Sequence, residues 1–93
     1  MRNVDLALYA DMLAGEAASL AARIEREYGK QRQAAIEHEA RAALPPYAVE
    51  RLDELGLLST RGDGAALAEL EEALDAVEVL QEWVEATLTR AAA

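Results

Sequence analysis

The sequence predicts an all-α protein: an antiparallel hairpin of two long helices joined by a short helix, with coiled-coil-like packing. Composition is the first observation, because 53% of the 93 residues are hydrophobic but many of these are alanine, and phenylalanine is absent. Alanine, leucine, glutamate and arginine favour helix, whereas the β-branched and aromatic residues that favour sheets are scarce. Spacing is the second observation, because apolar residues recur at steps of three and four, as in paired helices.

The first long helix is expected over about residues 4–43, since no proline occurs before Pro45. Asn3 can cap its start. Gly15 and Gly29 lie inside this range, and each glycine costs about 1 kcal/mol relative to alanine in a helix interior. The helix is therefore either continuous or is bent or broken at one of these glycines, and the sequence leaves that choice open.

A short helix is expected over about residues 46–56, followed by a loop at 59–64 and a second long helix at about 64–90. Pro45 and Pro46 end the first helix, and Pro46 suits the first turn of the next. Gly56 is a plausible stop, and Asp63 or Gly64 starts the last helix. All of this forms one helical domain over residues 1–93.

The last helix carries the clearest apolar line in the chain. Its members follow one another at steps of three and four residues: Leu67, Leu70, Leu74, Val77, Gln81, Val84 and Leu88. An acidic stripe with similar spacing runs along another side of the helix: Glu71, Asp75, Glu78, Glu82 and Glu85. This stripe is either a solvated surface or a partner for basic residues on the first helix.

The second interpretation predicts how the long helices align. The basic residues Arg23, Arg26 and Lys30 have the spacing of the acidic stripe read backwards. In an antiparallel hairpin, Arg23 would face Glu85, Arg26 would face Glu82 and Lys30 would face Glu78. The same alignment sets Leu20 against Leu88 and Ile24 against Val84. Exposed ion pairs contribute only about 0–1 kcal/mol each, so their role here would be to specify register.

That register leaves residues from about Asn3 to Glu16 without a partner helix. The overhang holds an apolar stretch that would be an unusually large exposed patch. It either folds back at Gly15 or is covered by another chain, and we expect a homodimer. Trp83 is either a core side chain or an interface anchor. The expected interface residues are Leu6, Leu8, Tyr9, Met12, Leu13 and Trp83.

Charge and residue types argue against several function classes. The net charge of −9 disfavours binding to nucleic acid or to an anionic membrane, and no apolar run is long enough to span a bilayer. The chain has no cysteine, and His38 has no second ligand three or four residues away. We therefore expect no metal, no cofactor and no catalytic residue, and we expect a cytoplasmic protein.

The segment Tyr47–Leu58 resembles the recognition-helix segment of winged helix-turn-helix regulators, where a helix ends in a Leu-Gly-Leu step. That resemblance implies a β-wing after the step, but the chain from Ala65 onward is predicted to be helical. The candidate recognition helix also carries Glu50, Asp53 and Glu54, which would repel phosphate.

The sequence thus favours a non-enzymatic protein–protein interaction module, such as an adaptor, assembly factor or regulatory subunit. It would act through apolar helix faces and an acidic surface, with a second copy of itself and another protein as partners. A small helix-turn-helix-like transcription regulator is the alternative. An enzyme with a composite site across a dimer is the third interpretation.

Overall fold

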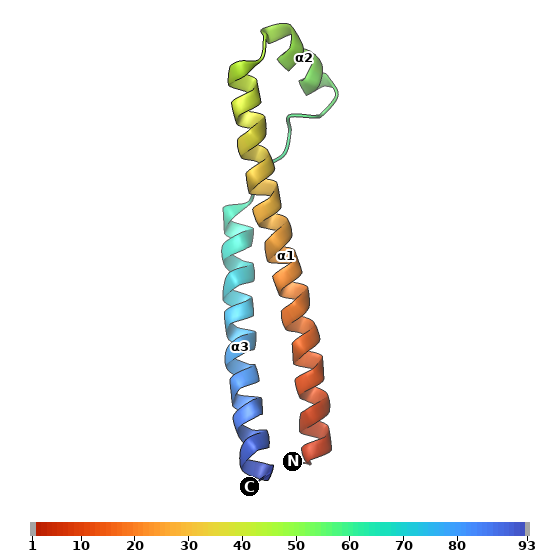
Figure 1. Cartoon of the computed structure of the whole chain (residues 1–93), viewed down its shortest axis with the longest axis vertical. Helices are drawn as coiled ribbons and strands as arrows, with labels where there is room; N and C mark the ends of the chain where they lie inside the picture. The colour runs from red at the N-terminus through yellow and green to blue at the C-terminus, as the bar shows by residue number, and fades with distance from the viewer. Residues whose placement is uncertain (1, 93) are drawn as a thin grey trace.

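The computed structural model describes residues 2–92, which form three helices: α1 (Asn3–Ala43), α2 (Pro46–Glu54) and α3 (Gly64–Ala92). The last helix packs antiparallel along α1, so both ends of the chain lie at the same end of a rod (Figure 1). The rod measures 70 × 17 × 16 Å. The prediction of an all-helical chain, with a short helix between two long ones, is confirmed. Within residues 2–92, no helix has the length and apolarity needed to cross a membrane.

Local sequence explains where each helix begins and ends. The first helix continues through Gly15 and Gly29 and ends just before Pro45 and Pro46, since proline disfavours a helical residue before it. The short helix ends at Gly56, whose φ of +72° is a left-handed conformation that favours glycine. Asp63 then caps α3, because its Oδ1 accepts hydrogen bonds from the backbone N–H groups of the third and fourth residues of that turn, Ala65 and Ala66, at 3.1 Å each.

The core is a thin line between α1 and α3. Among the described residues, six hydrophobic side chains are buried: Leu6, Leu13, Leu20, Ile24, Leu67 and Val84. Val84 is the most enclosed, at 1% exposure, and it forms a cluster with Leu6 and Leu13. Burying a leucine or valine contributes about 1.5–3 kcal/mol, so this short list holds most of the packing energy of the hairpin.

The predicted register is wrong. Val84 was expected beside Ile24, but it packs with Ala10, which lies 14 residues earlier in α1. Likewise, Leu20 lines a groove with Ala73 rather than lying beside Leu88. A shift of 14 residues is two heptads, or about 21 Å along the helix, so it preserves the three-and-four spacing of the apolar line.

The charge pairs that motivated that register do not form. The ion pairs found in the described part of the chain join Lys30 to Glu27, Arg41 to Asp53 and Arg51 to Glu54, so none connects α1 to α3. Exposed ion pairs contribute about 0–1 kcal/mol each, which is less than the burial of Leu6 and Leu13 contributes. The hairpin therefore adopts the register that covers those leucines.

The unpaired length of α1 lies at its C-terminal end instead of its N-terminal end. The linker 55–63 runs back along α1 and crosses it at Gln31, as Figure 1 shows. A Cβ on Gly62 would lie 2.6 Å from Gln31 Cγ, so the crossing needs glycine. The last three turns of α1 project beyond α3 and carry α2 at their tip.

Candidate interaction face

Apolar side chains are exposed near the open end of the hairpin, where the two termini meet. Leu8 is 64% exposed, Met12 53%, Val79 62% and Trp83 49%, and Tyr9 lies beside them on α1. We call these five residues the terminal patch. Large exposed apolar patches are uncommon on monomeric proteins and mark interaction sites.

Helix geometry places both halves of the terminal patch on one side of the hairpin. Met12 directly precedes the buried Leu13, and Trp83 directly precedes the buried Val84. In an antiparallel pair, residues that precede the packing residues of each helix lie on the same side. Met12 and Trp83 also lie at nearly the same height, because Ala10 packs beside Val84. The patch therefore spans both helices.

A charged groove continues this side of the hairpin toward the tip. It has a volume of about 450 Å³ and contains Arg23, Arg26, Lys30 and Glu27 from α1, with Glu69 from α3. Arg23 lies 11 residues after Met12, close to three helical turns, so it shares the direction of that side chain. By the same spacing, Glu69 lies four turns from Trp83. The terminal patch and the groove thus form one continuous surface, which we call the Trp83 face.

Glu27 is a polar residue of that groove with an unmet hydrogen-bonding group. Its Oε1 accepts a hydrogen bond from Lys30 Nζ at 3.1 Å. Its Oε2 is buried and has no hydrogen-bond partner among the described residues. Buried carboxylate oxygens without a partner are costly, so a donor supplied from outside the chain would stabilise this groove.

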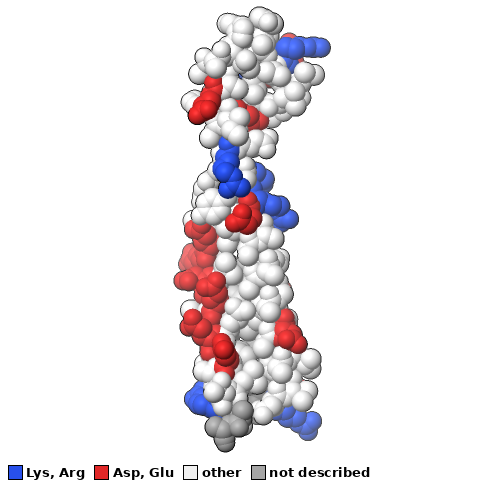
Figure 2. All heavy atoms as spheres, viewed as in Figure 1, with Lys and Arg blue, Asp and Glu red and all other residues white. Residues whose placement is uncertain are grey.

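The acidic stripe occupies the opposite side of α3. Glu71, Asp75, Glu78, Glu82 and Glu85 are all exposed, and Figure 2 shows acidic side chains in a column along that helix. We call them the acidic column. Glu85 lines a separate apolar groove with Ala10 and Leu88, on the side away from the Trp83 face. The solvated interpretation of the stripe is the one that the structure supports within the chain.

One carboxylate of the acidic column makes a contact between the helices. The Tyr28 hydroxyl donates a hydrogen bond to Glu71 Oε1 at 2.5 Å. This hydrogen bond, together with the negative charge of Glu71, raises the pKa of the tyrosine above its ordinary value. The contact holds α3 against α1 near the middle of the rod.

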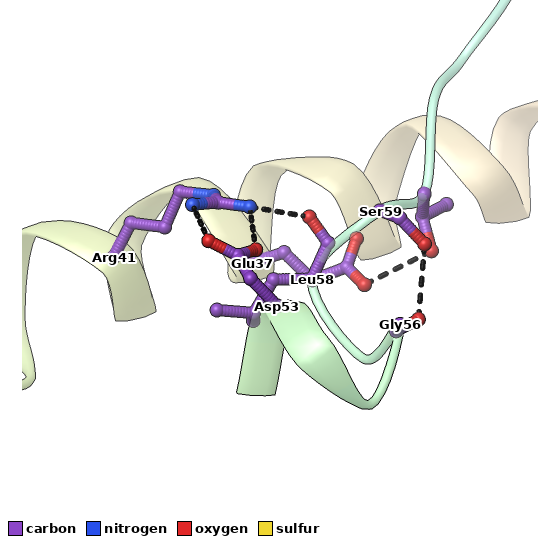
Figure 3. Close-up of polar contacts among 7 residues, drawn as sticks. Glu37, Arg41, Asp53, Gly56, Leu58 and Ser59 are labelled. Carbon is purple, nitrogen blue, oxygen red and sulfur yellow. Dashed lines mark hydrogen bonds and ion pairs between the residues drawn. The ribbon is translucent and has the colours of Figure 1, made fainter. Parts of the chain in front are cut away.

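A polar cluster holds α2 against the projecting end of α1 (Figure 3). Arg41 donates to both carboxylate oxygens of Asp53, one of them at 2.9 Å, and also to the Leu58 carbonyl at 3.0 Å. The hydrogen bonds and charge of the guanidinium lower the pKa of the Asp53 carboxyl. Thr60 donates to Glu37 Oε1 at 3.0 Å, and the other oxygen of this buried carboxylate has no partner in the part of the chain described. Since α2 buries no residue of its own, these polar contacts fix its position.

The structure divides the interface residues predicted from the sequence into two groups. Leu6 and Leu13 are each 4% exposed and lie in the core of the hairpin, so they are not available to a partner. The remaining four, Leu8, Tyr9, Met12 and Trp83, all lie in the terminal patch. The sequence argument missed Val79 and the groove beside Arg23, because the wrong register put the basic residues opposite the acidic column.

Other candidate sites receive little support from the geometry. His38 is exposed on α1, and within residues 2–92 no three His, Cys, Asp or Glu side chains are grouped closely enough to hold a metal ion. The segment Tyr47–Leu58 forms α2 and the turn after it, and no strand follows it in the described chain. No known protein-family model, curated protein or solved structure matches this chain.

Proposed function

We propose that this chain is a non-enzymatic helical interaction module that dimerises with itself and offers its acidic column to another protein. The observation that carries the proposal is the large surface of the hairpin. The chain exposes 6871 Å², whereas a compact monomer of its mass exposes about 5,300 Å². The excess of about 1,600 Å² is twice the area that each partner buries in a standard interface.

The shape of the molecule supports the same proposal. Its radius of gyration is 21.2 Å, against about 12 Å for a compact domain of 93 residues. Two helices alone leave most of each helix surface in water, and coiled-coil-like packing of further helices would bury more of it. A four-helix bundle made from two hairpins is the simplest assembly that does so.

The acidic column supports the second part of the proposal. Five exposed carboxylates on one side of α3 would repel a second copy of this acidic chain. The same charges would attract a protein with a basic surface and would speed its association. We therefore propose different partners for different sides of the hairpin.

Sedimentation equilibrium from about 1 to about 100 µM tests the self-association, over a range typical of moderately strong complexes. We expect a mass close to twice the 10.1 kDa of the chain, with a dissociation constant in or below this range. A folded, helical monomer throughout the range would refute the proposed dimer.

A further inference from the structure

We infer that the Trp83 face binds a second copy of this chain around a two-fold axis along the rod, so that α1 of each copy packs on α3 of the other. This inference rests on the proposed function and specifies its interface. It predicts a symmetric four-helix bundle in which every helix has two antiparallel neighbours. Three features of the Trp83 face support it: its apolar half, its charged half and the position of Gly15.

A two-fold axis along the rod keeps every residue at its own height. Within one hairpin, residues at equal height have numbers that add to about 94, as for Ala10 and Val84. The same rule then holds between copies. Met12 and Trp83, whose numbers add to 95, would therefore face each other twice across the interface. Aromatic and methionine side chains are enriched in the cores of protein interfaces.

The charged half of the face is self-complementary under the same axis. Arg23 would face Glu72 of the second copy, and Arg26 would face Glu69 of the second copy, since both pairs of numbers also add to 95. Both arginines and both glutamates are exposed in the single chain. Each contact would form twice by symmetry. Complementary charges of this kind fix the register of helices that apolar spacing leaves open.

A two-fold axis perpendicular to the rod explains these features poorly. Such an axis would turn one hairpin end over end, so with full overlap the terminal patch would lie against the charged groove. Met12 would then face the arginine-rich half of the second α1. The charge pattern therefore favours the axis along the rod.

Gly15 and Glu27 add independent support. Glycine inside a helix is unfavourable relative to alanine, and the space beside Gly15 is open, with nothing within 4 Å of a Cβ placed there. The axis along the rod would put Val79 of the second copy beside this gap. The second copy would also bring its own arginines toward the groove that holds the unpartnered Glu27 oxygen.

Two charge-reversed chains test the pairing between copies. Chain one carries Arg23→Glu and Arg26→Glu, and chain two carries Glu69→Arg and Glu72→Arg. Each chain alone should dimerise at least tenfold more weakly than the native chain, because like charges then meet at four places. An equimolar mixture should recover a heterodimer with affinity within about threefold of the native dimer, since every pair is complementary again.

A matched control reverses two charges on the other side of α3. Glu78→Arg with Glu82→Arg changes the net charge as much as chain two does, but it lies on the acidic column, so dimerisation should not weaken. Circular dichroism of every variant should show native helicity. If chain one or chain two dimerises as tightly as the native protein, or if the mixture fails to associate, the inference is refuted.

Single cysteines test the direction of the axis, because the native chain has none. Leu8→Cys and Thr87→Cys, placed on separate chains and mixed, should form a covalent heterodimer on oxidation. Cross-linking of Leu8→Cys to Arg26→Cys instead would show the end-over-end arrangement and refute the axis along the rod. A monomeric native chain would refute the proposed function as well, whereas a native dimer with the wrong cross-link refutes only this inference.

Discussion

Replacing Leu13 with alanine separates the observed register from the one that the charge pattern predicts. Leu13 is 4% exposed and clusters with Leu6 and Val84. Truncating a buried leucine to alanine costs about 2–5 kcal/mol, through lost burial and the cavity left behind. We expect about 3 kcal/mol here, toward the lower end, because a two-helix core can partly collapse around the gap. For a domain of this size, that loss lowers the Tm by about 10–20 °C.

Urea denaturation followed by circular dichroism at the helical band provides the measurement. Leu8→Ala is the matched control, since Leu8 lies five residues away and is 64% exposed. At protein concentrations where the chain is monomeric, Leu8→Ala should change the free energy of unfolding by less than about 0.5 kcal/mol. In the register predicted from charge, both leucines lie in an exposed overhang. Equal and small effects of the two substitutions would therefore refute the packing of α3 over Leu13.

Two further predictions concern the linker and the tip. Gly62→Ala should lower the free energy of unfolding by about 1–3 kcal/mol, measured by the same urea titration, because the added methyl group would meet Gln31 at 2.6 Å; an unchanged midpoint would contradict this close crossing. Asp53→Asn should speed hydrogen exchange of the α2 amides and leave α1 unchanged, because the charged contact with Arg41 holds the short helix in place. Since folding lowers the pKa of Asp53 from its ordinary value of 3.8, this stabilisation is complete above that value and is lost as the pH falls through the lowered pKa. Exchange of the native α2 should therefore rise at low pH, and the same rise in Asp53→Asn would contradict the assignment.

Much of the helix layout follows from the sequence alone, because it depends on contacts within a few residues. Pro45 and Pro46 end α1 wherever the rest of the chain lies, since their rings restrict the preceding backbone. Gly56 stops α2 for a similar local reason, and the Asp63 carboxylate caps α3. The large share of alanine and leucine decided the all-helical fold.

Gly15 and Gly29 show where local reasoning leaves a choice open. Either glycine could interrupt α1, yet the helix runs through both. The packing of Leu13 and Leu20 on α3, on both sides of Gly15, offsets the cost of glycine in the helix. That packing depends on a helix more than forty residues away along the chain, so no local pattern reports it.

The register could be decided only by the tertiary structure. The apolar lines of α1 and α3 repeat every seven residues, so sliding the helices by two heptads brings an equivalent set of positions together. Charge spacing favoured one of these alignments, but exposed ion pairs are too weak to choose between them. The burial of Leu6 and Leu13 chose the other, and with it the exposed set Leu8, Met12 and Trp83. The sequence by itself determined the helices and their apolar lines, whereas the tertiary structure decided which apolar residues are core and which form the interaction face, because burial summed over the whole rod sets the alignment.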